Sequence, residues 1–270
     1  MLARLDAAGA RRGRVVGVTG APGAGKSTLV GELAVRLVAA APGRAVAVLA
    51  VDPSSPVSGG ALLGDRTRVR FPAGEPRLYF RSQAAAGELG GVARTTFQVC
   101  RLLTRLFDVV FVETVGVGQS EIEIVRVADR TYLIVPPLAG DHVQFMKAGI
   151  MELPDAFVVS KADVGEPASA TFHALRASLR LARPGAEVPL HRVSARTGAG
   201  VDTLCAEILT GPAGAGVEAR AAHFFERWVA AEHGRRGVAR LTAAGGAAAY
   251  VAAHGGFEAA QAAFDGEVGA

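Results

Sequence analysis

Short apolar runs alternate with longer stretches of helical periodicity along the first 210 residues of the chain. The runs are rich in Val, Leu, Ile and Phe, and they are continuous rather than alternating with polar positions. Strands buried on both faces of a parallel sheet have this pattern. The sequence therefore predicts a three-layer α/β fold with a mostly parallel central sheet. The expected strands are 14–19, 45–51, 77–81, 108–113, 131–135, 156–160 and 188–193, and the expected helices are 26–40, 92–106, 120–128, 142–152, 168–182 and 200–209.

The pattern changes after residue 210, where TGPAGAGV has the composition of a linker. We expect a short N-terminal extension at 1–12, one α/β domain at 13–210, and an Ala/Gly-rich, helical C-terminal region at 211–270. Within that region, residues 222–233 have the pattern of a short amphipathic helix. The chain from 243 onward is either a loosely packed helical hairpin or partly disordered.

Composition and charge narrow the classes of partner. The net charge is +4 and the basic residues are scattered, which argues against a nucleic-acid partner. No apolar run approaches the roughly 20 residues that cross a bilayer, and the N-terminus lacks an apolar signal core, so no membrane partner is expected. Cys100 and Cys205 are far apart and have no metal-ligand spacing. These features predict a soluble protein of the reducing cytoplasm.

Residues 20–27, GAPGAGKS, match the phosphate-binding pattern G-x-x-x-x-G-K-[ST] between an expected strand and an expected helix. Glycines let backbone N–H groups turn toward phosphate oxygens at the helix N-terminus. Lys26 is expected to reach the β- and γ-phosphates, and the Ser27 hydroxyl is expected to bind Mg²⁺. The residues expected to bind the nucleotide in this segment are Gly20, Ala21, Pro22, Gly23, Ala24, Gly25, Lys26, Ser27 and Thr28.

Carboxylates stand at the carboxyl ends of two expected strands, where ligands bind in open α/β sheets. Asp52 and Glu113 each end an apolar run, and both are suited to hold Mg²⁺ or its waters. Gly116 then lets the chain pass close to a γ-phosphate. Asp65 lies in a glycine-rich loop and supplies a ligand for metal or phosphate. Gln119 either orients the attacking water or caps the next helix.

The stretch AFVVSKAD at 156–163 has the form of a guanine-reading loop, with Ser160 where such a loop normally begins with Asn. Asp163 would accept hydrogen bonds from guanine N1–H and the 2-amino group, a donor pair that adenine lacks. Lys161 would pack its stem along the base and tie down the phosphate loop. After the last strand, Ser194 and Ala195 place a backbone N–H near guanine O6. These residues predict GTP or GDP as the nucleotide.

Lysine is rare in this chain: of the 29 basic residues, 26 are Arg and three are Lys. The three lysines are Lys26, Lys147 and Lys161. Lys is a compact point charge, whereas Arg is a planar fork. Each Lys falls in a segment that carries a separate functional signal. We therefore favour a specific use of Lys at these positions over a chance distribution.

Taken together, the segments resemble the MeaB/ArgK-type P-loop GTPases. The resemblance covers about residues 14–205, and its most specific part is ETVGVGQSE at 113–121. It implies a P-loop GTPase domain with a small helical appendage, and a third switch near 139–149 that relays nucleotide state to a partner. The implied Mg²⁺ ligands are Ser27, Asp52, Asp65 and Glu113, and the implied relay residues are Asp141, Gln144 and Lys147.

Members of that family act as chaperones of adenosylcobalamin-dependent acyl-CoA mutases, with methylmalonyl-CoA mutase the best-known client. They use GTP to gate cofactor delivery and protect the mutase from inactivation. The resemblance therefore implies such a mutase as the partner, and a homodimer formed through the C-terminal region. Hydrolysis is expected to be slow alone and stimulated by the client. Lys26 and Mg²⁺ would neutralise the developing charge, while Glu113 or a loop group such as Asp65 would orient water.

Three other functions stay open at this point. A metallochaperone-type GTPase for another metalloenzyme would need a His- or Cys-rich metal site, and the six His are scattered. A P-loop ATPase or small-molecule kinase would need no guanine-reading loop, so Asp163 and the VSA segment at 193–195 argue against it. A module that binds GTP without turnover would not need the expected catalytic set of Lys26, Asp65 and Glu113.

Overall fold

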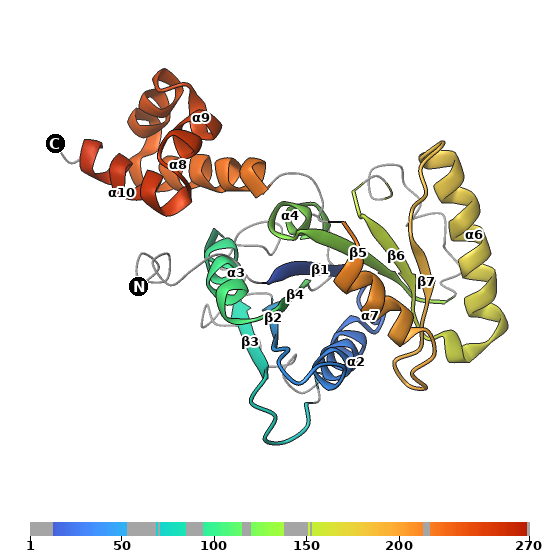
Figure 1. Ribbon diagram of the computed structural model, residues 1–270. Coiled ribbons are helices and arrows are strands. Elements are labelled where there is room, and N and C mark those ends of the chain that lie inside the picture. Colours follow the sequence, from blue (N-terminus) through green and yellow to red (C-terminus); the bar gives the residue numbers. More distant parts are fainter. Residues whose placement is uncertain are drawn as a thin grey trace, which may run out of the picture.

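The computed structural model describes residues 13–52, 69, 71–84, 94–114, 120–137, 151, 153–212 and 217–268, with the side chains of 52, 84, 94, 120–122 and 217–219 left out. Its centre is a sheet of seven parallel strands in the order β3-β2-β4-β1-β5-β6-β7 (Figure 1). The strands are β1 (Arg14–Gly20), β2 (Val46–Asp52), β3 (Leu78–Ala84), β4 (Val109–Thr114), β5 (Arg130–Val135), β6 (Ala156–Val159) and β7 (Leu190–Arg192). Every expected strand is confirmed within a few residues.

The central strands are apolar and covered on both faces, as is typical of a parallel sheet, whereas the edge strands β3 and β7 are only partly buried. In β4 and β5 every residue is buried, and alternate residues enter different cores. Val110 and Val112 pack on one side of the sheet, and Val109 and Phe111 on the other. The continuous apolar runs of the sequence are thus explained by burial on both sides.

Helices complete the three layers (Figure 1). On one face, α2 (Lys26–Ala39) and α7 (Val201–Thr210) pack over the sheet. On the other face lie α3 (Arg94–Leu106), α4 (Ser120–Val127) and α6 (Glu166–Ala182), with the short 3₁₀ helix η2 (Ala162–Val164) before α6. The five corresponding helix predictions are confirmed. The helix expected at 142–152 falls almost entirely outside the described residues.

The C-terminal region is more ordered than the sequence indicated. It consists of α8 (Val217–Ala243), which bends at Gly234, followed by α9 (Gly246–Ala253) and α10 (Phe257–Val268). The partly disordered alternative is therefore wrong for residues 243–268. The expected helix 222–233 is one part of the longer α8. Aromatic rings from these helices pack into a buried cluster, which supplies the apolar area that Ala and Gly lack.

The C-terminal helices pack against the α/β domain beside α3 (Figure 1). Phe224 of α8 stacks on Phe97 of α3 with ring centroids 4.3 Å apart, and Glu258 of α10 forms an ion pair with Arg101 of α3. Arg220 donates a 2.6 Å hydrogen bond to Asp129, whose other carboxylate oxygen accepts from the backbone N–H of Val15. Because both members of the Arg220–Asp129 pair are buried, loss of either one would leave an uncompensated charge.

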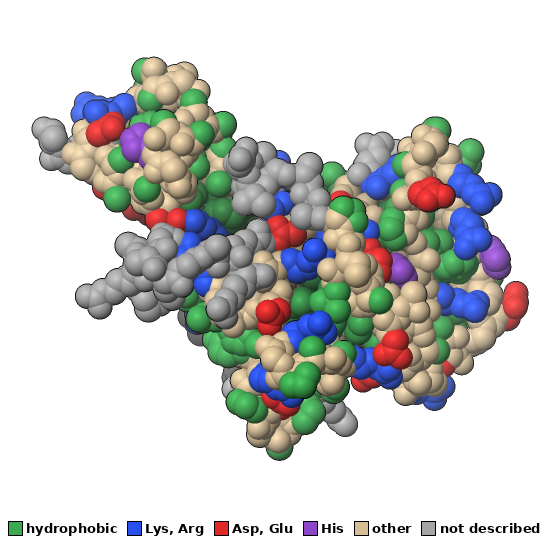
Figure 2. All heavy atoms as spheres, in the orientation of Figure 1, with side chains coloured by type: hydrophobic (Ala, Val, Ile, Leu, Met, Phe, Trp, Pro, Cys, Tyr) green, Lys and Arg blue, Asp and Glu red, His purple; other side chains and the backbone are tan. Residues whose placement is uncertain are grey.

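Charges on the surface are mixed. Figure 2 shows basic and acidic side chains interspersed on the visible face rather than gathered by sign. Within the described residues, no helix is both long and apolar enough to cross a membrane, and no three His, Cys, Asp or Glu side chains are grouped as a metal site.

Replacing Phe225 with Ala should lower the free energy of unfolding by about 3–5 kcal/mol, because it empties the centre of the aromatic cluster. Phe225 is fully buried, and its ring lies 5.3–5.9 Å from those of Trp228, Tyr250, Phe257 and Phe264. Urea unfolding followed by circular dichroism measures the change. Leu181→Ala, at a side chain 82% exposed, is the control and should stay within about 0.5 kcal/mol. Equal stability of the two variants would contradict the packing described here.

Candidate functional site

The loop between β1 and α2 has the backbone shape of an anion cradle. Gly20, Gly23 and Gly25 have φ values of 141°, 76° and 88°, and Gly25 is the N-cap of α2. A Cβ on Gly20 would lie 2.2 Å from the carbonyl oxygen of Ile134 in β5, so only glycine fits there. The start of the 14-residue helix α2 adds its partial positive charge. The geometry suits phosphate oxygens.

Two lysines bind carbonyl groups of this loop. The Lys26 Nζ donates hydrogen bonds of 2.8 and 3.1 Å to the carbonyls of Gly20 and Ala21. The Lys161 Nζ donates a 2.9 Å hydrogen bond to the carbonyl of Gly23. Lys161 has φ 51° and is the one non-glycine residue with positive φ in the described part of the chain. Its strained backbone brings the second ammonium onto the loop.

Ser27 and Glu113 meet at the carboxyl ends of β1 and β4. The Ser27 hydroxyl donates a 2.6 Å hydrogen bond to Oε1 of Glu113, and both residues are buried. On the other face of the sheet, one residue further along β4, the hydroxyl of Thr114 donates to that of Thr19 at 2.9 Å. A hydroxyl and a carboxylate side by side form a pair of hard oxygen donors, which is the ligand type that Mg²⁺ prefers.

Asp52 ends β2, beside β4, where Ala50 pairs with Glu113 and Val51 pairs with Thr114. Its backbone therefore reaches the same edge of the sheet as Glu113. Its side chain lies outside the described part of the structure. Six further residues that the sequence analysis singled out lie entirely outside the described part of the structure. They are Asp65, Gly116, Gln119, Asp141, Gln144 and Lys147.

Ser160 connects the end of β6 to the phosphate loop. Its side chain is buried, and its hydroxyl donates a 2.7 Å hydrogen bond to the carbonyl of Ala24. The carbonyl of Val135 in β5 lies 3.4 Å from the same hydroxyl. The Ser160 hydroxyl therefore donates its hydrogen bond within the protein. Ser160 holds two loops together from a position facing away from solvent.

Asp163 is held from two sides. Its Oδ1 accepts a 2.6 Å hydrogen bond from the hydroxyl of Ser194, and its Oδ2 lies 2.7 Å from Nη2 of Arg196. The Ser194 hydrogen bond, with a smaller contribution from Arg196, lowers the pKa of Asp163 below its ordinary value. The carboxylate is therefore ionised at neutral pH. The backbone N–H of Ala162 donates to the carbonyl of Val193 at 2.9 Å and ties the two loops together.

The structure thus brings together the phosphate loop, Ser27, Glu113 and the two loops that carry the predicted base-reading residues. Ala195 directly follows Ser194 in the second of these loops. The sequence reasoning missed Arg196. Its signal was present, since Arg196 is the next residue after the VSA segment at 193–195.

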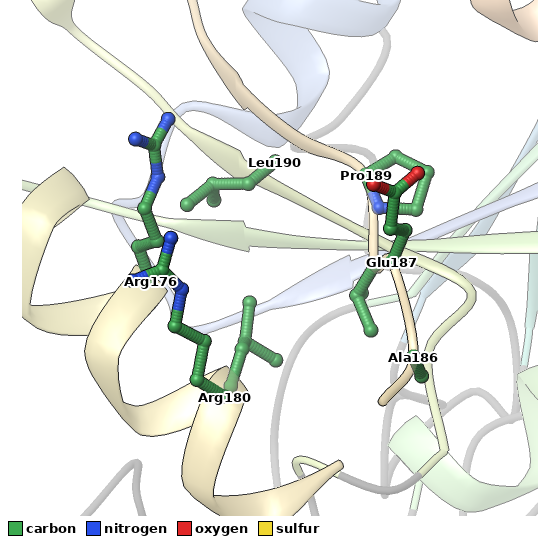
Figure 3. Close-up of a pocket in the computed structure, with 8 residues that line it drawn as sticks. Arg176, Arg180, Ala186, Glu187, Pro189 and Leu190 are labelled. Atoms are coloured by element: carbon green, nitrogen blue, oxygen red, sulfur yellow. The ribbon is translucent and has the colours of Figure 1, made fainter. Parts of the chain in front are cut away.

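Two surface cavities lie elsewhere. One, of about 500 Å³, is lined by α6 and the chain entering β7, at the opposite end of β7 from Ser194 (Figure 3). Figure 3 labels Arg176 and Arg180 on α6, with Leu190 beside them and Glu187 and Pro189 across the pocket. The other, of about 750 Å³, lies between α3 and the C-terminal helices. Neither includes a residue of the phosphate loop, so neither belongs to the candidate nucleotide site.

Comparison with known proteins identifies the relatives of this chain. A "Probable GTPase" of Mycobacterium bovis is 43% identical over 195 residues, which are 70% of this chain and 57% of that protein. The "Methylmalonic aciduria type A homolog, mitochondrial" of Mus musculus is 41% identical over 196 residues, 70% of this chain and 46% of that protein. The chain spans about half the length of such curated relatives.

Among solved structures, that of an "LAO/AO transport system kinase" is 26% identical, with a TM-score of 0.57, and the match covers 90% of this chain and 69% of that one. HypB from Helicobacter pylori in complex with nickel, 16% identical, has the same fold with a TM-score of 0.56, over 77% of this chain and 91% of that one. Both comparisons confirm the predicted fold class.

The family described as "Methylmalonyl Co-A mutase-associated GTPase MeaB" matches residues 1–218, which leaves almost all of α8 and the whole of α9 and α10 beyond the match. The match spans the phosphate loop, the Ser27–Glu113 pair and Asp163. The resemblance predicted from the motifs is confirmed. The chain belongs to the MeaB family of methylmalonyl-CoA mutase-associated GTPases.

Proposed function

We propose that this chain hydrolyses GTP to GDP and phosphate and acts as a chaperone of an adenosylcobalamin-dependent acyl-CoA mutase. Family membership supports the class of reaction and the class of client. The observation that carries the nucleotide assignment is the pairing of a phosphate cradle with an oriented carboxylate, Asp163, on loops joined to the cradle by Ser160 and Lys161. Such a site can hold a nucleotide at both its phosphates and its base.

In this proposal the phosphates lie in the cradle from Gly20 to Thr28. The carbonyls of Gly20, Ala21 and Gly23 accept from Lys26 and Lys161, so these ammonium groups stand beside the position of the bound phosphates. Lys26 would exchange its carbonyl contacts for phosphate oxygens. Its charge then stabilises the negative charge that develops on the transferred group.

Mg²⁺ fits the pair formed by Ser27 and Glu113, because both offer oxygen atoms at the end of the cradle. We propose that these residues hold the ion or its waters, together with Asp52 and with Asp65. When bound, Mg²⁺ would neutralise charge on the β- and γ-phosphates. Glu113, with Asp65, would orient the attacking water, and Gly116 would approach the γ-phosphate.

Asp163 is proposed to distinguish guanine from adenine. Its ionised carboxylate accepts the N1–H and 2-amino donors of guanine, whereas adenine would bring an acceptor, N1, against a negative charge. Ser194 fixes the carboxylate, and the backbone N–H of Ala195 would bind guanine O6. The Ser160 hydroxyl is committed to Ala24, so its proposed role is to connect the loops and not to bind the base.

Transmission to the mutase is proposed to run through Asp141, Gln144 and Lys147. The identity of the mutase, slow hydrolysis that the client stimulates, and a homodimer remain predictions from the family resemblance. The expected cytoplasmic location and the lack of nucleic-acid and membrane partners also stay predictions. Turnover of GTP with and without a candidate mutase tests the chaperone role: stimulation of hydrolysis is expected, and a rate unchanged by every acyl-CoA mutase tried would contradict it.

Calorimetry with Mg²⁺ should show that GDP binds and that ADP binds at least about tenfold more weakly, because only guanine supplies the donor pair for Asp163. Asp163→Asn should reverse the preference from GDP to XDP. The Asn amide can still accept from xanthine N1–H, and its NH₂ can donate to the 2-oxo group. Equal affinity for GDP and ADP in the unmodified protein would remove the guanine assignment and favour the ATPase or kinase reading.

Removing Mg²⁺ with EDTA should weaken GDP binding by the unmodified protein, and Ser27→Ala should abolish most of this dependence. The expected loss of affinity in the presence of Mg²⁺ is about tenfold, since a contact to a charged partner is removed. Glu113→Gln should behave in the same way, and Ser178→Ala, at a half-buried serine of α6, is the control. An unchanged response to EDTA in both site variants would disprove the metal assignment.

Ser160→Ala should weaken GDP binding by about three- to tenfold without changing the GDP/ADP ratio, because it removes a buried hydrogen bond that links the loops. Ser178→Ala again serves as the control, since its hydroxyl donates to the carbonyl of Ala174 in the preceding turn of its own helix. A changed GDP/ADP ratio with unchanged GDP affinity would mean that Ser160 contacts the base instead.

A further inference from the structure

Arg196 makes a contact that the proposed site does not require. Its side chain is 77% exposed, yet Nη2 lies 2.7 Å from Oδ2 of Asp163. The other carboxylate oxygen is held by Ser194, which is fully buried and also accepts a 3.2 Å hydrogen bond from the backbone N–H of Thr197. Asp163 therefore has a fixed inner partner and an outer partner that reaches it from solvent.

The outer partner has the same chemistry as the predicted ligand. Guanine contains a guanidine unit, C2 bonded to N1, N2 and N3, whose N1–H and 2-amino group present two neighbouring N–H donors in one plane. The guanidinium of arginine presents N–H donors in a similar planar fork, and carboxylates bind such forks. We propose that Arg196 is an internal mimic of guanine, which occupies Asp163 in the nucleotide-free protein and must leave when the base binds.

This inference rests on the proposed role of Asp163, and it adds a specificity-determining residue outside the predicted set. Arg196 is suited to leave because most of its side chain is already in solvent, so release needs no repacking. Ser194 is unsuited to leave because it is buried and held by the turn that follows it. An exposed ion pair is weak, so the competition should amount to between about two- and fivefold.

Competition of this kind also favours guanine over adenine. Guanine replaces the N–H donors that Asp163 loses when Arg196 departs. Adenine offers no such donor pair, so in its presence the carboxylate keeps Arg196 and the base position stays partly filled. Arg196 thereby penalises a base that cannot take its place.

The competition has a kinetic signature. If only the fraction of molecules with Arg196 displaced can accept the base, the apparent Kd rises by the inverse of that fraction. The loss then appears in the association rate, whereas the dissociation rate from the bound state is unaffected. A residue that only supports the loop would instead change the dissociation rate, because its removal weakens the bound complex.

The test uses the full chain and stopped-flow binding of a fluorescent GDP analogue labelled on the ribose. Arg196→Met keeps the length of the side chain and removes the donors, and it should raise the association rate about two- to fivefold with an unchanged dissociation rate. Arg196→Lys keeps the charge without the planar fork and should give an intermediate increase. Arg192→Met is the matched control: Arg192 bonds to Ser169 and lies over Phe172, and its loss changes the net charge equally.

Affinity for inorganic pyrophosphate should be the same in all four proteins, because pyrophosphate has no base. An association rate for GDP that is unchanged or lower in Arg196→Met, or an equal gain in Arg192→Met, would overturn the inference and leave the guanine site intact. Failure of every protein to bind GDP, with pyrophosphate still bound, would refute the proposed guanine site and this inference with it.

Discussion

The close approach of β1 to β5 at Gly20 is the constraint on which the candidate site depends. β1 is paired on both sides, with β4 and with β5, and its last residue lies opposite Ile134. The 2.2 Å separation between an added Cβ and the Ile134 carbonyl leaves no room for a side chain there. The chain can therefore turn out of the sheet into the cradle directly at the strand end. All other elements of the site reach this turn from neighbouring strands of the same parallel sheet.

The shape of the cradle also depends on the hydrogen bonds that its carbonyl groups accept. Ala24 accepts from Ser160, Gly23 from Lys161, and Gly20 and Ala21 from Lys26. Carbonyl oxygens that turned toward a phosphate would repel it, and the hydrogen bonds from Ser160 and Lys161 hold those of Ala24 and Gly23 away from that position. The two lysines add positive charge at the same time, which a neutral donor would not do. This explains why a chain that otherwise uses arginine has lysine at both positions: an ammonium is compact enough to reach carbonyls within the loop.

The strands and the cradle could be predicted because their signals are local. Burial on both faces gives a continuous apolar run, and a phosphate cradle needs glycine at fixed offsets. The helical character of the C-terminal region was predicted, but its packing was not, since Phe224 and Phe257 are buried by contact with Phe97, more than 120 positions earlier in the sequence. For Ser160 the sequence showed a missing Asn, and only the contact with Ala24 showed what the hydroxyl does. Arg196 was overlooked because its significance depends on where Asp163 lies.

The C-terminal helices, which lie almost entirely beyond the family match, also contact elements next to the candidate site. α4 begins at Ser120, directly after the glycine-containing segment in which the sequence places a γ-phosphate contact. Arg227 of α8 donates a 3.0 Å hydrogen bond to Glu123 of α4, and His223 lies 3.0 Å from Arg126. α3 is bound in turn through Phe97 and Arg101. α8 contacts both α3 and α4, and α10 contacts α3. A displacement of α3 or α4 on the sheet would therefore break contacts with the C-terminal helices. The C-terminal helices therefore restrain α3 and also α4, which directly follows the segment of the predicted γ-phosphate contact, and any such movement has to overcome an aromatic interface as well as the sheet packing.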